Sequence, residues 1–79
     1  MKVFIHSLER TLYEGEGGVV MLPTKDGEIS VLNGHIPLVT ALKSGTVRVK
    51  ESESAVKEFP VSSGFAQVNK SNLILLLKP

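Results

Sequence analysis

Apolar and polar residues alternate with a period of two along almost the whole chain. The clearest case is the stretch in which Val47 and Val49 alternate with the cations Arg48 and Lys50. No window of helical length shows an apolar stripe with a 3.6-residue period. This pattern is typical of β-strands that bury one face. The run 73–77 is instead apolar at every position, which predicts a central strand covered on both faces.

Turn signals separate these runs at intervals of roughly 8–12 residues. The dipeptides at 26–27 (Asp-Gly) and 33–34 (Asn-Gly) supply the positive φ angle that a tight turn needs. Pro60 has no N–H group to donate to a β-ladder, so we expect it at an edge or a bulge. We therefore predict a single all-β domain over residues 1–79. Its expected form is an antiparallel β-sandwich, or flattened barrel, of about eight to ten short strands.

The composition argues against several classes of protein. Nine basic and eight acidic residues are interspersed and give a net charge of +1, so the chain lacks the basic stripe that nucleic-acid binding requires. It has no cysteine, and hence no disulfide, thiolate or sulfur-ligated metal. No apolar stretch approaches the roughly 18 residues of a membrane-spanning helix. We expect a soluble, cytoplasmic chain that is monomeric when isolated and reaches a membrane only through a partner.

The residues that often carry chemistry form no recognisable catalytic or metal-binding pattern. His6 and His35 are far apart in the sequence, and neither has a second histidine at metal-ligand spacing. The glycine-rich stretch 14–18 leads into a predicted strand, whereas a phosphate loop leads into a helix. Acidic pairs flank predicted turns, and no serine lies in a nucleophile elbow. We expect no metal, no cofactor and no catalytic residue, although a triad assembled only in the folded chain stays open.

Residues 23–42 resemble a segment of the ε subunit of F-type ATP synthases, in which Gly-Glu-Leu-Gly precedes Pro-Gly-His-x-Pro-Leu-Leu-Thr-Ala-Leu. Further motifs follow the same order. Residues 12–16 resemble the family's Phe/Tyr-x-Gly-Glu turn, and residues 43–49 resemble its Lys-Pro-Gly-x-Val-Arg-Val. Residues 59–68 resemble its Phe-x-Val-Ser-Gly-Gly-Phe-x-Glu-Val, and residues 72–76 resemble its closing Asn-x-Val-x-Val/Leu-Leu strand. The resemblance covers nearly the whole chain.

The resemblance implies a ten-stranded β-sandwich that serves as a non-catalytic subunit of the central stalk, or rotor. In that family the subunit links γ to the membrane c-ring during proton- or sodium-driven ATP synthesis, on the cytoplasmic side of the membrane. By matching position, Ser7 and His35 lie toward γ, and Glu28 lies toward the polar loops of the c-ring. The adjoining rotor-facing surface would consist of Ile36, Pro37, Leu38 and Thr40. A loop-ordering hydrogen bond is an equal alternative for His35, and solvated charge is one for Glu28.

Three departures from the family pattern matter. Asn33 replaces the usual proline before the Gly-His pair, and Ser63 replaces a glycine at a position where a positive φ angle would be strained. The sequence stops at Pro79, where the family continues into a C-terminal helical hairpin. That hairpin carries inhibition of ATP hydrolysis and, in some members, ATP binding, and we assign neither. Two other classes compete: a free-standing β-sandwich module that binds a small ligand or protein, and, less favoured, an enzyme.

Overall fold

In the computed structural model, which describes residues 1–34 and 37–79, the chain forms nine strands and no helix. All-β architecture and the predicted eight to ten strands are thereby confirmed, and the nine strands of the described residues are one fewer than the resemblance implies. The strands are β1 (Lys2–His6), β2 (Thr11–Glu16), β3 (Val19–Thr24), β4 (Gly27–Leu32), β5 (Leu38–Leu42), β6 (Gly45–Lys50), β7 (Val56–Val61), β8 (Ser63–Val68) and β9 (Asn72–Lys78).

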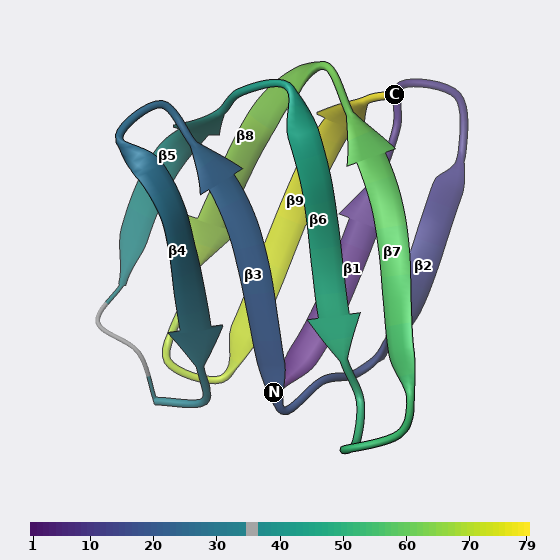
Figure 1. Ribbon diagram of the computed structural model, residues 1–79, viewed down its shortest axis with the longest axis vertical. Helices are drawn as coiled ribbons and strands as arrows, with labels where there is room; N and C mark the ends of the chain where they lie inside the picture. The colour runs from purple at the N-terminus through teal and green to yellow at the C-terminus, as the bar shows by residue number, and fades with distance from the viewer. Residues whose placement is uncertain (35–36) are drawn as a thin grey trace.

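The strands form one sheet that curls on itself into two facing layers (Figure 1). Their order is β2-β1-β9-β8-β5-β3-β6-β7, and β4 pairs with β3. We call β4, β3, β6 and β7 the front layer, and β5, β8, β9, β1 and β2 the rear layer. The arrangement is the sandwich, or flattened barrel, that the alternating pattern predicts.

One strand pair is an exception to antiparallel pairing. Strands β1 and β9 run parallel, with Lys2 opposite Asn72 and His6 opposite Leu76. A parallel pair needs a long connection, and here the seven strands between β1 and β9 provide it. Local sequence patterns carry no information about this pairing, because the two strands lie near opposite ends of the chain.

The hydrophobic core lies between the layers and takes alternate residues from most strands. Val47 and Val49 are fully buried while Arg48 and Lys50 point outward, as their alternation predicts. The buried apolar residues are Val3, Ile5, Val20, Leu22, Val31, Leu42, Val47, Val49, Val61, Ala66, Val68, Leu73, Leu75 and Leu77.

The apolar run 73–77 lies in β9, which is a central strand between β1 and β8, as predicted. The prediction that both its faces are covered is wrong for the part of the chain that the structure describes. Leu73, Leu75 and Leu77 are buried, but Ile74 and Leu76 are 37% and 44% exposed. A two-layer sandwich covers only the inner face of each layer, so the outer face of β9 meets solvent.

The turns agree with the sequence signals. Gly27 and Gly34 have φ angles of 118° and 83°, and Pro60 lies on the edge strand β7 opposite Thr46. No described residue other than glycine has a positive φ angle, so the strain considered for Ser63 does not arise there. The constrained position is the next one, Gly64, with a φ angle of 158°.

The two ends of the sandwich carry different turns (Figure 1). The upper end carries the turns at 7–10, 25–26 and 43–44, and the lower end carries those at 17–18, 51–55 and 69–71. Asn33 and Gly34 also lie at the lower end, where the Gly34 amide donates to the Lys70 carbonyl oxygen at 2.9 Å. Ser7 and Glu28 therefore share one end of the molecule, and the Asn-Gly turn lies at the other.

Tyr13 on β2 joins the rear layer to the front layer. Its ring packs against Phe59 on β7 with the ring centroids 5.5 Å apart, and its hydroxyl donates to the Glu51 carboxylate in the turn after β6. Burial of the phenol, together with the hydrogen bond to Glu51, raises the pKa of Tyr13 to about 12.

Candidate partner-binding face

The outer side of the rear layer is apolar across four neighbouring strands. Val39 on β5 and Phe65 on β8 are 72% and 60% exposed, next to the half-exposed Ile74 and Leu76 of β9. Strand pairing makes these side chains neighbours, since Phe65 lies opposite both Ala41 and Leu76, and Ile74 lies opposite Phe4. We call the set Phe4, Val39, Ala41, Phe65, Ile74 and Leu76 the apolar face.

The apolar face has the composition of a protein–protein contact. The outer side of an antiparallel sheet that meets only water is usually polar, because alternation places polar residues there. Glu14 of β2, opposite Phe4, and Lys78 at the end of β9 lie at the margin of the apolar face, and one polar residue, the exposed Gln67 of β8, lies within it between Val39 and Ile74. An apolar centre with a polar rim is the usual anatomy of an interface between proteins.

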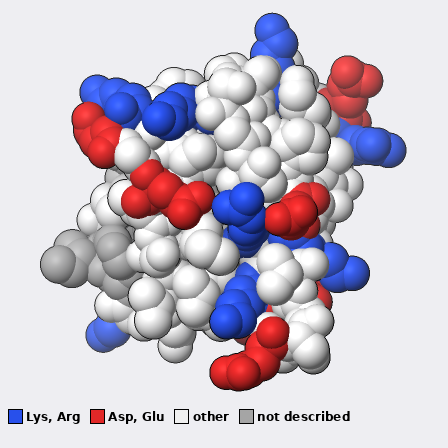
Figure 2. Space-filling model, in the orientation of Figure 1, with Lys and Arg blue, Asp and Glu red and all other residues white. Residues whose placement is uncertain are grey.

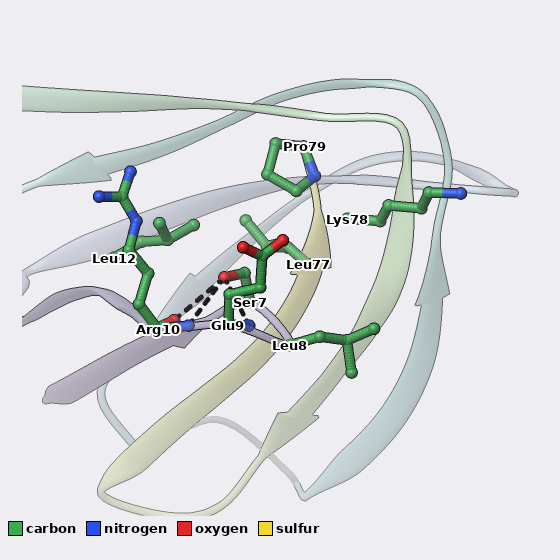
Figure 3. A pocket seen from close by; sticks show the side chains of 8 residues that line it. All are labelled: Ser7, Leu8, Glu9, Arg10, Leu12, Leu77, Lys78 and Pro79. Atoms are coloured by element: carbon green, nitrogen blue, oxygen red, sulfur yellow. Dashed lines mark hydrogen bonds between the residues drawn. The ribbon is translucent and has the colours of Figure 1, made fainter.

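The upper margin of the apolar face contains a groove of about 390 Å³. Its apolar walls come from the turn at 7–10, from the end of β5 and from the pairing of β8 with β9, and they include Leu8, Phe65 and Leu76. A second hollow of about 540 Å³ lies on the other side of the same turn, between Arg10, Leu12 and Pro79 (Figure 3).

The turn at 7–10 is ordered by a single side chain, that of Ser7. Its hydroxyl accepts hydrogen bonds from the amides of Glu9 and Arg10, at 3.3 and 3.2 Å, and donates to the Arg10 carbonyl oxygen at 3.2 Å (Figure 3). The Ser7 amide also donates to that carbonyl at 2.8 Å. Leu8, at the tip of the turn, is 91% exposed.

Glu28 lies on the outer side of the front layer in a row of charged side chains. Arg48 contacts Glu28 at 3.4 Å through Nη1 and Glu58 at 2.9 Å through Nε. Acidic and basic side chains accordingly alternate across the middle of this layer (Figure 2). Glu28 is thus an exposed, ion-paired carboxylate beside a turn, and the geometry fits both a partner contact and the solvated-charge alternative.

Of the predicted partner contacts before and within β5, some are exposed and others face the core. Pro37 is exposed, whereas Leu38 packs against the core, and the half-buried Thr40 lies opposite the buried Ala66. His35 and Ile36 lie outside the described residues. That Leu38 and Thr40 face a partner stays a prediction, and it is the intervening Val39 that projects into solvent.

Sequence reasoning missed the most exposed apolar residues, Leu8, Val39 and Phe65. The alternating pattern of β5 and β8 could have indicated the exposure of Val39 and Phe65. Val39 follows Leu38, which packs against the core, and Phe65 precedes the buried Ala66. Leu8 has no such signal, because it lies in the turn between β1 and β2, outside any alternating strand.

The described residues contain no group of three His, Cys, Asp or Glu side chains that would hold a metal ion. His6 instead pairs through Nδ1 with the hydroxyl of Thr11 at 3.1 Å. Within the same part of the chain, no helix has the length and apolar character needed to cross a membrane.

Curated relatives of the chain share one name. A protein of Dichelobacter nodosus called "ATP synthase epsilon chain" is 37% identical over 75 residues, which are 95% of this chain and 52% of that protein. The protein of the same name from Nostoc sp. is 33% identical, and the match covers 98% of this chain and 57% of that protein. The one from Chlorobium limicola is 36% identical, and the match covers 95% of this chain and 85% of that protein. The chain spans about half the length of most of these relatives.

Solved structures share the fold. A chain of the Euglena gracilis mitochondrial ATP synthase, in an assembly of OSCP, F1 and c-ring, superimposes with a TM-score of 0.87 at 22% identity, covering 95% of this chain and 48% of that one. A chain of the Tetrahymena thermophila mitochondrial ATP synthase, in its central stalk and c-ring, superimposes with a TM-score of 0.83 at 13% identity. The match covers all of this chain and 63% of that one. The family described as the β-sandwich domain of the ATP synthase delta/epsilon chain matches residues 1–78, and this chain belongs to it.

Proposed function

We propose that this chain is a non-catalytic part of the central stalk of an F-type ATP synthase, where it fastens the γ subunit to the c-ring so that torque passes between them. The coupling ion is a proton or a sodium ion, and the chain sits peripherally on the cytoplasmic side of the membrane. Its family membership supports the assignment to the synthase. The observation that carries the coupling role is the apolar face, which the described chain leaves uncovered.

The γ subunit is the partner that we assign to the apolar face. A rotor joint has to resist torque, which requires a well-packed contact with an apolar centre. The apolar face offers such a centre on paired strands, where each side chain is fixed by its neighbours. Leu8, the neighbour of Ser7 in the turn at 7–10, lines the groove at the upper margin of this face, which supports the proposal that the turn lies toward γ.

The c-ring loops are the partner that we assign to the upper end around Glu28. Glu28 belongs to the front layer and lies beside the turn at 25–26, so a protein bound to it leaves the apolar face of the rear layer free. Two partners can therefore bind at once. Pro37, Leu38 and Thr40 remain predicted contacts from the segment before and within β5, and His35 and Ile36, which lie outside the described residues, remain predicted contacts as well.

Gel filtration of the chain with its cognate γ subunit tests the proposal, followed by a titration that gives the dissociation constant. We expect co-elution, and we expect Phe65→Asp to weaken binding by about 2 kcal/mol or more, because it places an unpaired charge in the apolar centre. Val56→Asp is the matched control, since Val56 is 46% exposed on the front layer. It should bind γ as the unmodified chain does.

Failure of the unmodified chain to co-elute with γ would overturn the coupling role and favour the alternative of a free-standing binding module. Equal weakening by Phe65→Asp and Val56→Asp would show that γ does not use the apolar face.

A further inference from the structure

Leu8 exposes a larger fraction of its side chain than any other large apolar residue in the described part of the chain, 91%. Exposed leucines are common on protein surfaces and usually need no explanation. Leu8 differs because it stands at the tip of a tight turn whose conformation is fixed by four hydrogen bonds. Because the backbone of the turn is already ordered, a partner that covers Leu8 has to order only the side chain, which lowers the entropy cost of binding.

Leu8 is also continuous with the apolar face. It lines the groove of about 390 Å³ together with Phe65 and Leu76, which are members of that face. A partner that covers Phe65 and Leu76 and extends toward the upper end therefore meets Leu8 next. Leu8 and Phe65, which both line the groove, would then contact an apolar side chain of that partner.

The Ser7 hydroxyl has no capacity left for a partner. A serine hydroxyl offers one donor and two acceptor lone pairs. Ser7 uses its donor on the Arg10 carbonyl oxygen and both acceptor positions on the amides of Glu9 and Arg10. A direct hydrogen bond between this hydroxyl and γ would have to replace one of the hydrogen bonds within the turn, so we attribute an effect of Ser7 on γ binding to the order of the turn itself.

We propose that Leu8 is an anchor residue for γ and that Ser7 is the positioning residue that presents it. This inference rests on the proposed function, because γ is the partner it names. The partner side of the contact is an apolar side chain inserted into the groove between Leu8 and Phe65. Aromatic residues and arginine are the commoner anchors of interfaces, so the assignment of Leu8 rests on its exposure and on its place in the groove, not on its residue type.

Binding of γ to four variants tests the inference. We expect Leu8→Ala to weaken binding about tenfold or more, and Ser7→Ala to weaken it about threefold to tenfold. Ser7→Thr should restore binding to within about twofold, because a threonine hydroxyl forms the same turn. Leu32→Ala is the matched control: Leu32 is 55% exposed at the lower end of the front layer, and its loss should leave binding unchanged.

Urea unfolding of the four variants gives the folded fraction in each titration, and binding is calculated on that fraction, so that each outcome decides one point. No binding of the unmodified chain overturns the proposed function itself. Binding that is unaffected by Leu8→Ala, or affected equally by Leu32→Ala, overturns the anchor. If Leu8→Ala weakens γ binding but Ser7→Ala does not, the positioning role of Ser7 is overturned. It is also overturned if Ser7→Ala weakens γ binding and Ser7→Thr does not restore it.

Discussion

Phe65 on β8 lies directly opposite Leu76 on β9, and both side chains are exposed on the outer side of the rear layer. Cross-strand pairs of this type stabilise a sheet by roughly 0.2–1 kcal/mol. They also leave apolar area in contact with water, and covering that area is favourable by about 25 cal/mol per Å². The pair therefore stabilises the rear layer, and its exposed apolar area favours the binding of a partner that covers it.

Two adjacent residues of β5 should respond to the same substitution in opposite ways. Leu38 packs against the core, so Leu38→Asp should lower the free energy of unfolding by about 2 kcal/mol or more through a buried, unpaired charge. Val39 is 72% exposed, so Val39→Asp should leave stability within about 0.5 kcal/mol of the original and weaken γ binding instead. Urea unfolding and γ titration of both variants make the comparison, and a stable Leu38→Asp chain would contradict the inward orientation.

Gly64 should tolerate no side chain. A Cβ atom added there would collide with the carbonyl oxygen of Leu76 on the neighbouring strand. Since backbone cannot move aside without breaking the β8–β9 ladder, we expect Gly64→Ala to destabilise the chain by about 2 kcal/mol or more. Gly18→Ala serves as the control, because its Cβ would lie 3.6 Å from the Lys50 carbonyl oxygen, an ordinary contact distance. Equal unfolding midpoints for the two variants would contradict this account.

Local pattern was enough to predict the strands but not their partners. The alternation of Val47 and Val49 with cations predicts both the strand and its buried face, because side-chain direction in a strand repeats every two residues. The Asp-Gly and Asn-Gly signals predict their turns for an equally local reason. The parallel pairing of Lys2 with Asn72 depends on contacts between distant parts of the chain, which no local window contains.

The same limit explains the incomplete prediction of the site. An apolar residue such as Leu76 predicts that its side chain is covered, but not whether the cover belongs to this chain or to another. Ser7 was predicted from family resemblance as a contact of γ, and only the structure shows that its hydroxyl is fully used within the turn. Leu8 shows the converse, since its exposure follows from that turn and from no periodic pattern.

Glu28 and Glu58 offer a matched pair for the predicted c-ring contact. Both carboxylates pair with Arg48 and both are more than half exposed, so replacing either with glutamine should change stability by about 0–1 kcal/mol. Only Glu28→Gln should weaken assembly with the c-ring, because only Glu28 lies beside the turn at the upper end. Pull-down of the c-ring by the γ-bound chain at low salt measures the difference. If both variants retain the same amount of c-ring, the alternative interpretation of Glu28 as a solvated surface charge is favoured.

Tyr13 should make the stability of the chain sensitive to alkali. The pKa of its hydroxyl is raised to about 12 from an ordinary 10.0, chiefly by burial and then by the hydrogen bond to Glu51. The unfolded chain therefore loses the phenolic proton at a lower pH than the folded chain does. The stabilising contribution is fully present below pH 10 and is lost as the pH rises toward about 12. Urea unfolding at pH 9 and pH 11 measures this loss, and Tyr13→Phe, which keeps the contact with Phe59 but cannot ionise, should show a smaller decrease over the same interval. An equal decrease in both chains would mean that lysine titration, and not the Tyr13–Glu51 hydrogen bond, sets the alkaline limit of the fold.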